Sequence, residues 1–216
     1  MTLLSLDPGS KAVGWAFFTN DLVAIDADTT VPHKHTLDRC GLIRGKTLIE
    51  LAADASRQVR LPDSVDVKVI LEKPQVYQRR NGRTKGDPND LITIAIAGGI
   101  VLGVIMEHNS ITEVELAKPA AWKMGQTPKE IENARALAAL TRDEKIIYAR
   151  CVESVSASLR HNVLDAVSIA LFAVGRKQRR ASPTKAVTGG GPPFWCPNCG
   201  QYNGTHSKKC GFDERT

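Results

Sequence analysis

The chain has 216 residues, with 42% hydrophobic and 24% charged content and a formal net charge of +6 at pH 7. These values are those of an ordinary soluble globular protein that can bury one good core and has some residues left for an appendage. The positive surplus indicates a polyanionic partner without identifying it, whereas simple solubility would explain the surplus but not its clustering.

The apolar segments and the cysteines exclude several classes of protein. The longest apolar stretch, Leu91 to Met106, includes Thr93 and two adjacent glycines and is too short and too mixed for a membrane span, so we expect no membrane association. The sequence opens directly on a strand pattern, and we expect no secretory signal. Cys40 and Cys151 are isolated in the sequence and the other three cysteines crowd its end, which indicates a reducing compartment rather than a disulfide framework.

The first half of the chain predicts strands, one helix and a long loop. A helix is expected over residues 45–60, where apolar residues recur at helical spacing. Prolines, glycines and charges mark residues 73–89 as the loop. The expected strands, the first three of them a meander with turn residues between, cover about residues 2–7, 12–18, 22–27 and 67–72.

The second half predicts mainly helices. Asn89 or Asp90 can cap a helix running to about residue 108, and Thr127 can cap another in which Pro128 is the first residue. Thr141 or Asp143 opens the next one. The remaining expected elements are a strand over 111–116, a short turn from Pro119 and a last helix over about 162–177. This order of elements predicts a mixed α/β layer fold.

The composition changes at the basic run 176–180. Glycines and prolines cluster over residues 189–193, a composition typical of a linker that cannot bury a core. The basic run can follow a DNA arm, although basic residues at a helix end also favour the helix macrodipole. We predict a folded domain over residues 1–178, a linker over 179–193 and a separate small module over 194–216.

Three carboxylates follow or interrupt apolar segments. Asp7 and Glu72 each end an apolar strand, and Asp165 is the single acid of the apolar helix Val163 to Val174. Buried acids are costly unless positive charge offsets their desolvation, so clustering would make a site for a divalent metal. Alternatively, Asp7 caps a turn, Glu72 pairs with Lys73 and Asp165 is an ordinary acid near a helix N-terminus. Each alternative is plausible alone, but their coincidence is much less expected.

Short motifs around these acids resemble RuvC-type Holliday junction resolvases of the ribonuclease H-like superfamily. The opening LSLDPGSKAVGW over residues 4–15, the segment ILEKPQVY over 70–77 and the segment HNVLDA over 161–166 match in order. Phage-borne relatives are the most similar in style, especially around residues 85–90. The acids alone would also suit an actin-like kinase, but such a kinase needs a second glycine-rich phosphate loop, and none is evident in the sequence.

The resemblance implies a ribonuclease H-like mixed sheet flanked by helices, with Asp7, Glu72 and Asp165 as ligands of Mg²⁺ or Mn²⁺. It also implies a homodimer that nicks opposite strands of a four-way DNA junction, in the cytoplasm of a bacterial or phage-infected cell. The family commonly has an acid or histidine three residues before the last aspartate, where this chain has Asn162. Asn162 or His161 can complete the metal shell, while a purely structural His161 is the alternative.

Cations follow the second acid and recur later in the chain. Arg79, Arg80, Arg83 and Lys85 are expected to meet DNA phosphates, with a solvated loop as the alternative. Tyr77 can stack on an unpaired base or simply pack under the loop. The resemblance adds two backbone contacts in a lysine-bearing segment, Lys123 and Lys129. Trp122, directly before Lys123, is expected in the core.

The C-terminal module carries a metal-ligand pattern. Two cysteines separated by two residues are followed by a histidine and a further cysteine within a short span, a spacing that suits tetrahedral Zn²⁺ with no open position for catalysis. Glycines around them permit tight turns. A disordered tail with loose thiols is the alternative, and nucleic acid, a partner protein or the dimer mate are all open as contacts. The predicted zinc ligands are Cys196, Cys199, His206 and Cys210.

The sequence therefore predicts a metal-dependent, structure-selective endonuclease acting on DNA four-way junctions. A ribonuclease that processes structured RNA is the alternative within the same superfamily. From a different class, a junction-binding protein with weak catalysis is suggested by Asn162, which departs from the acidic pattern.

Overall fold

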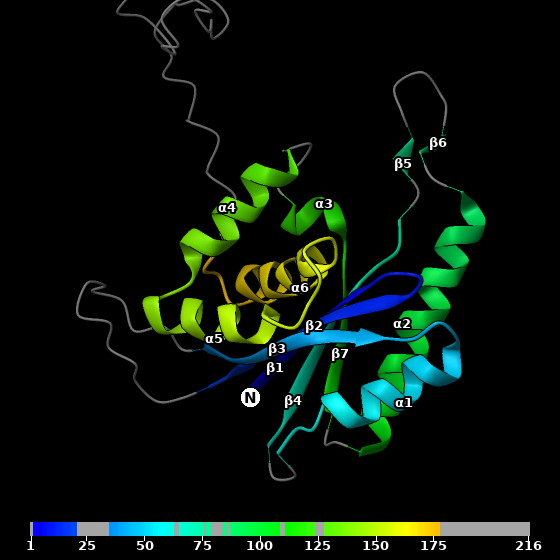
Figure 1. Ribbon diagram of the computed structural model, residues 1–216, viewed down its shortest axis with the longest axis horizontal. Coiled ribbons are helices and arrows are strands. Elements are labelled where there is room, and N and C mark those ends of the chain that lie inside the picture. The colour runs from blue at the N-terminus through cyan, green and yellow to red at the C-terminus, as the bar shows by residue number, and fades with distance from the viewer. Residues whose placement is uncertain are drawn as a thin grey trace, which may run out of the picture. The chain divides into compact units, whose positions relative to one another are not determined.

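The computed structural model describes residues 2–20, 35–62, 65–75, 77–78, 84–85, 87–108, 111–123 and 128–177. The chain divides into two units, Met1–Arg179 and Arg180–Thr216, and every described residue belongs to the first. The first unit is an α/β structure built on one sheet (Figure 1).

The five-stranded sheet has the order β3-β2-β1-β4-β7, and it is mixed. The first three strands along the chain are antiparallel neighbours, whereas β4 and β7 run parallel to β1. The strands of this sheet are β1 (Thr2–Pro8), β2 (Ala12–Thr19), β3 (Thr36–Arg44), β4 (Val67–Glu72) and β7 (Ile111–Ala117). A separate pair consists of β5 (Tyr77–Gln78) and β6 (Thr84–Lys85).

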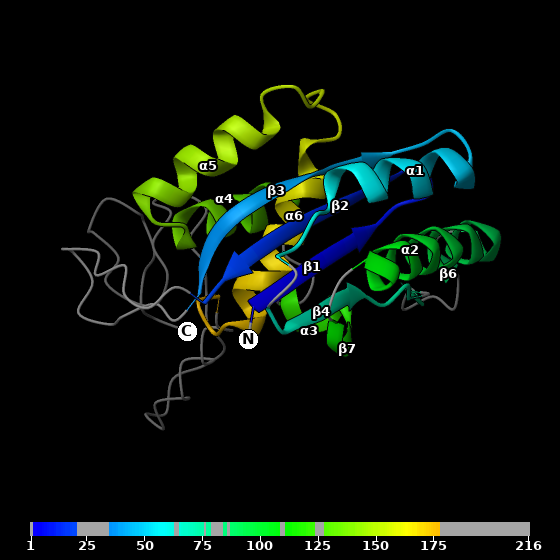
Figure 2. The same ribbon diagram turned by 90° about the horizontal axis from the view of Figure 1, so that it is seen from below.

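Helices cover both faces of the sheet, as Figures 1 and 2 show. The helices are α1 (Leu48–Gln58), α2 (Pro88–His108), α3 (Pro119–Trp122), α4 (Lys129–Ala139), α5 (Arg142–Val152) and α6 (Arg160–Ala173). Side chains alternate along β1, so Leu4 and Leu6 pack towards α1 and α2, whereas Leu3 packs towards α6. The predicted fold class, a mixed sheet flanked by helices, is confirmed.

Several predicted boundaries differ from the structure. The third strand is β3, which the sequence did not predict, and the strand expected over 22–27 lies outside the described residues. Within the predicted loop, Asp87 caps α2, because its side chain accepts a hydrogen bond from the Asn89 amide (2.9 Å). Thr141 caps α5 as predicted, in a capping box with Glu144. Pro128 is the N-cap of α4 rather than its first residue.

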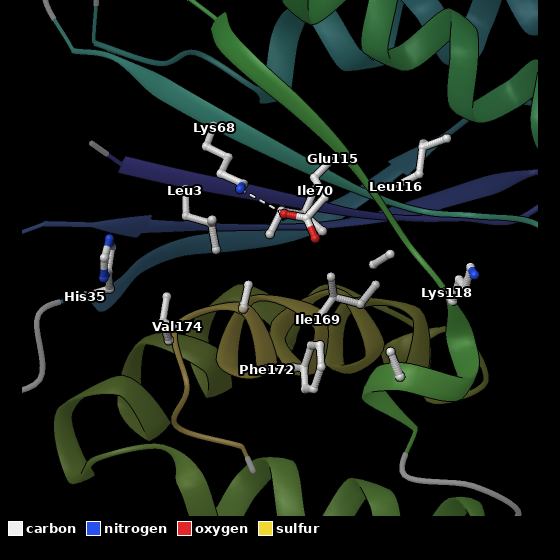
Figure 3. Close-up of a pocket in the computed structure, with 13 residues that line it drawn as sticks. Leu3, His35, Lys68, Ile70, Glu115, Leu116, Lys118, Ile169, Phe172 and Val174 are labelled. Atoms are coloured by element: carbon white, nitrogen blue, oxygen red, sulfur yellow. Dashed lines mark ion pairs between the residues drawn. The ribbon is translucent and has the colours of Figure 1, made fainter. Parts of the chain in front are cut away.

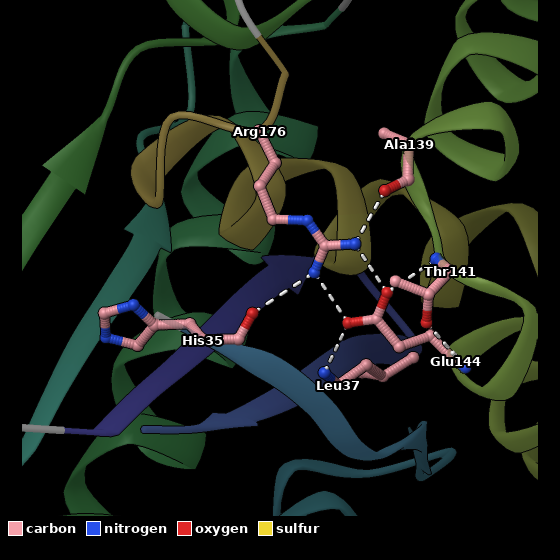
Figure 4. Close-up of polar contacts among 6 residues, drawn as sticks. All are labelled: His35, Leu37, Ala139, Thr141, Glu144 and Arg176. Atoms are coloured by element: carbon pink, nitrogen blue, oxygen red, sulfur yellow. Dashed lines mark hydrogen bonds and ion pairs between the residues drawn. The ribbon is translucent and has the colours of Figure 1, made fainter. Parts of the chain in front are cut away.

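The basic run 176–180 is not free at its start. Arg176 donates to both carboxylate oxygens of Glu144, at 2.6 and 2.5 Å, and both side chains are buried (Figure 4). Its guanidinium also donates to the Ala139 and His35 carbonyls. Because Lys177 is buried as well, the expectation that the whole run can follow DNA is wrong for its first two residues. They fasten the end of α6 to its neighbours instead.

Gly14 allows α6 to approach β2 closely. A side-chain carbon at Gly14 would lie 2.0 Å from the Asn162 carbonyl oxygen, at the first turn of α6. Gly14 is also the β2 residue opposite Asp7 in β1. The absence of a side chain at residue 14 therefore sets the distance between the N-terminus of α6 and the end of β1.

Replacing Gly14 with alanine should push α6 away from the sheet. We expect Gly14→Ala to lower the free energy of unfolding by more than about 2 kcal/mol, since the obstructing atom is backbone and cannot rotate away. Thermal and urea unfolding measure this change. Ser10→Ala, an exposed change in the same hairpin, should stay within about 0.5 kcal/mol of the wild type. Equal stability of the two variants would contradict the close approach.

Candidate active site

The three predicted acids lie at one end of the sheet. Asp7 is the penultimate residue of β1 and Glu72 the last of β4, and these parallel neighbours bring their carboxyl ends together. By alternation, Asp7 shares the sheet face of Leu3, which α6 covers. Asp165, in the second turn of α6, is close enough that its charge acts on Asp7 and the charge of Glu72 acts on it.

A buried hydrogen bond fixes α6 beside this end of β1. Ser5 is completely buried, and its hydroxyl donates to the carbonyl of Ala166 at 2.7 Å. Ala166 directly follows Asp165 in the chain, and Ser5 precedes Asp7 by two residues on the same sheet face. The bond therefore holds the two aspartates in register with each other.

Burial first, and crowding second, raise the pKa of two of the acids. Burial is the largest cause for Asp7, whose pKa lies well above its ordinary value; a hydrogen bond with Glu72 and the charges of Glu72 and Asp165 raise it further, and Lys123 opposes them. Burial also raises the pKa of Asp165, against the positive charges of Lys123 and Lys129. The Asp7 carboxyl therefore loses its proton at a higher pH than a solvated aspartate does.

Two lysines lie beside the acids. Lys123 Nζ donates to Glu72 Oε1 at 3.2 Å, and Lys129 Nζ is 4.0 Å from Asp165 Oδ2. Burial opposes the charge on Lys123, yet the charges of Glu72, Asp7 and Asp165 raise its pKa above the ordinary value. One ammonium group thus interacts with all three carboxylates. The predicted contact of both lysines with the DNA backbone stays a prediction.

The Trp122 ring contacts two lysines, Lys123 beside the acids and Lys177 at the end of the described chain. The predicted core position of Trp122 is confirmed, because only 1% of the residue is exposed. The ring centre lies 4.5 Å from Lys123 Nζ and 5.3 Å from Lys177 Nζ, a favourable arrangement for two cations on one indole. Lys177 Nζ is 2.8 Å from Glu132 Oε2, and Arg135 pairs with the other oxygen of that glutamate at 3.0 Å. The ammonium group of Lys123 therefore contacts both the buried Trp122 ring and Glu72.

The donor chemistry of the site suits a hard cation. Three carboxylates provide only oxygen atoms, which Mg²⁺ and Mn²⁺ prefer. Glu72 Oε2 is buried and has no hydrogen-bond partner among the described residues. Within the same residues, no three histidine, cysteine or acidic side chains stand in an arrangement ready to hold a metal. A divalent ion held by these carboxylates would supply the positive charge that their burial requires.

His161 and Asn162 occupy the first turn of α6, and both are half-buried. The positive charge of His161 lowers the pKa of Asp165, so this histidine belongs electrostatically to the site. The part of Asn162 that packs on β2, against Gly14, is its backbone carbonyl.

The predicted DNA-contacting loop is described only in part. After Glu72, β5 and β6 pair Tyr77 with Lys85 and Gln78 with Thr84, so a short hairpin stands within the segment predicted as a loop. The other predicted contacts and all predicted zinc ligands lie outside the described residues: Arg79, Arg80, Arg83, Cys196, Cys199, His206 and Cys210.

A pocket of about 480 Å³ lies on the same sheet face, and the three acids do not line it (Figure 3). The Lys68 ammonium borders it, 2.8 Å from a carboxylate oxygen of Glu115. Ile169 and Phe172 of α6 form another wall. Sequence reasoning missed this pocket, because its walls come from segments far apart in the chain.

No protein-family model matches the sequence, and no curated protein matches it significantly. Among solved structures, Thermus thermophilus RuvC is 18% identical, with coverage of 81% of this chain and 94% of that one and a TM-score of 0.46. The fowlpox virus Holliday junction resolvase is 16% identical, with 81% and 99% covered and a TM-score of 0.45. The T. thermophilus RuvC complex with Holliday junction substrate is 17% identical, with 83% and 98% covered and a TM-score of 0.43. Likeness at this level concerns the fold alone.

Asp7→Asn should stabilise the metal-free protein. Since the folded-state pKa of Asp7 is raised, its ionisation destabilises the fold as pH rises from the ordinary value of about 3.9 through the raised value. At pH 8 with a chelator, we expect the variant to melt above the wild type, by about 2–4 °C for each kcal/mol gained. Added Mg²⁺ should raise the melting temperature of the wild type more than that of the variant.

Thermal melts over a pH series, with and without Mg²⁺, measure both effects. Asp38→Asn, at an exposed ion pair with Arg39, serves as the matched control and should change neither the pH dependence nor the response to Mg²⁺. Wild type and Asp7→Asn melting in parallel across pH would show that the acids do not strain the fold.

Proposed function

We propose that this chain is a nuclease that uses Mg²⁺ or Mn²⁺ to hydrolyse DNA phosphodiesters at branched structures, above all four-way junctions. The observation that carries the proposal is the meeting of Asp7, Glu72 and Asp165 from two strand ends and a helix, with their charge only partly compensated. The sequence motifs around the same three residues support a junction resolvase among the nucleases.

The acids would hold the metal, which when bound activates water and stabilises the leaving oxygen. Glu72, which accepts a hydrogen bond from Lys123 on Oε1 and shares another with Asp7, would supply a ligand of fixed orientation. Lys123 and Lys129 already stand next to the acids and would neutralise phosphate oxygens drawn to the same place. The half-buried His161, which acts on Asp165, is the residue that would hold or move a proton there.

One observation favours a junction-binding protein with weak catalysis as the second candidate. Among the described residues no ready metal group exists, and the Lys123 ammonium occupies one oxygen of Glu72. A site of this kind can bind phosphate without cutting it.

Cleavage of a mobile four-way junction separates these functions. We expect the wild type to cut it with Mg²⁺ or Mn²⁺ but not with chelator, and Asp165→Asn to lower the rate by more than about 100-fold, above the usual loss for an outer-shell partner of a metal site. Asp143→Asn, on the exposed start of α5, should cut at the wild-type rate. Flap DNA and structured RNA in parallel reactions define the substrate. Binding without cutting in every metal would establish the second candidate, and preferential cutting of RNA would establish a ribonuclease.

The exposed face of α2 supports the proposed homodimer. The segment Pro88–Glu107 has a mean hydropathy of 2.0, and only 22% of it is buried. By length and composition alone this helix could cross a membrane, although the shorter segment Leu91 to Met106 was expected to be too short and too mixed. It nevertheless packs on the sheet through Ala97, Val101 and Ile105. Its outer side has a spacing of four and three residues, as in a helix–helix seam: Ile92, Ile96, Gly99, Gly103 and Met106.

Charged substitutions on this face should separate the protomers. Ile92 is 58% exposed and Ile96 is 45% exposed. We expect the double variant Ile92→Glu/Ile96→Glu to sediment as a monomer while the wild type sediments as a dimer, because buried unpaired charges disfavour association. Ile49→Glu, at a residue 82% exposed on α1, is the matched control and should remain dimeric. A monomeric wild type at micromolar concentration would refute this interface.

A further inference from the structure

Two cysteines that are isolated in the sequence meet in the structure. Cys40 lies within β3 and is buried, whereas Cys151 lies in the last turn of α5 and is half-buried. Cys151 packs against the buried cluster that contains Cys40, each thiol shifts the pKa of the other through a hydrogen bond, and neither is in a disulfide. The pair is remote in sequence from the acids and is absent from the motifs that suggest a nuclease.

The contact follows from how α5 covers the outermost strand of the sheet. Within the part of the chain that the structure describes, β3 has a strand neighbour on one side only, so its outward amides need other acceptors. Glu144 accepts a hydrogen bond from the Leu37 amide at 2.8 Å, and the Cys151 sulfur accepts one from the Cys40 amide. Glu144 and Cys151 are two helical turns apart and share a face of α5. The position of the Cys151 sulfur is thus set by helix α5, which carries it, and by strand β3, whose amide it accepts from.

The surroundings make the two sulfurs unequal. The hydrogen bond from the Cys40 thiol is the largest cause that lowers the pKa of Cys151 to about 6; burial opposes it, the Cys40 amide adds to it, and the charges of Asp38 and Arg39 oppose each other. The pKa of Cys40 is raised by the same hydrogen bond and by burial. Tyr148, the other titratable group here, has a pKa raised to about 12 by burial first, and it stays neutral at physiological pH. The hydrogen bond between the two thiols therefore favours the charged form at Cys151 and the neutral form at Cys40.

We propose that Cys151 and Cys40 form a thiol–disulfide exchange site for low-molecular-weight disulfides, with Cys151 as the attacking and Cys40 as the resolving residue. The Cys151 thiolate attacks one sulfur of the small disulfide, forming a mixed disulfide and releasing one small thiolate. The Cys40 sulfur then attacks Cys151 Sγ and displaces the second small thiolate, which takes up the Cys40 proton. The small disulfide is reduced to two thiols, and the protein gains one bond between β3 and α5.

The exposure of the two residues fits these roles. Cys151 is half-buried and is the more exposed of the two residues, as the attacking role requires, whereas Cys40 is only 5% exposed and would react with its neighbour. The product would tie α5 to the edge of the sheet across a long stretch of chain, so oxidation should raise the melting temperature.

The test uses the full-length protein and glutathione disulfide. Peptide mapping after reaction at pH 7 should find a Cys40–Cys151 disulfide in the wild type, a glutathione adduct on Cys151 in Cys40→Ser, and an unmodified Cys40 in Cys151→Ser. The rate of Cys151 alkylation by iodoacetamide should reach half its maximum near pH 6, rather than near the ordinary thiol value of about 8.5. A triple variant, Cys196→Ala/Cys199→Ala/Cys210→Ala, controls for the other cysteines and should give the same disulfide.

Two results would overturn the proposal. One is a wild type that accumulates the adduct on Cys151 without a bond to Cys40. The other is alkylation of Cys151 with the pH dependence of an ordinary thiol. A melting transition like that of the wild type shows that each serine variant is folded. If a serine variant misfolds, Cys40→Ala or Cys151→Ala takes its place, so that loss of reaction is not a consequence of unfolding.

Discussion

The mutual repulsion of Asp7, Glu72 and Asp165 is the constraint on which the rest of this structure depends. Parallel pairing of β1 with β4 forces the first two acids together, and the Ser5 bond to α6 brings the third. Nothing in local propensity favours such crowding. It persists because the sheet and α6 are held by apolar burial on both faces, and because the Lys123 ammonium offsets part of the negative charge.

The two ends of α6 are fastened by different means, and both affect the acids. At its N-terminus, the bare backbone of Gly14 admits the helix against β2. At its C-terminus, Arg176 and Lys177 enter buried ion pairs with Glu144 and with Glu132. A buried charge pair adds little net stability over an apolar substitute, but losing one partner is costly, so such pairs define where the helix ends. The position of Asp165 is therefore specified from both directions.

The parts of the site that the sequence predicted are those fixed by local pattern. Asp7 at a strand end and Asp165 in an apolar helix are visible as exceptions within apolar runs, and chain order places them in one α/β layer. Contacts between distant segments were not predictable in this way. The basic run that includes Arg176 has the composition of a linker, and its role emerges only when Glu144 lies opposite. Likewise, nothing near Cys151 in the sequence indicates the edge strand that places Cys40 beside it.

The contacts of Lys123 also explain why cations crowd a site built of acids. Lys123 is held on the Trp122 ring rather than by the acids alone, so it would remain beside them if a divalent ion took over the carboxylate oxygens. Its charge would then be left without a partner in a partly buried place, which favours the arrival of an anion. A polyanion that brings phosphate to the ion satisfies both charges at once. In this arrangement, occupation of the site by a cation and by a phosphate is mutually reinforcing, because each offsets the charge that the other leaves uncompensated.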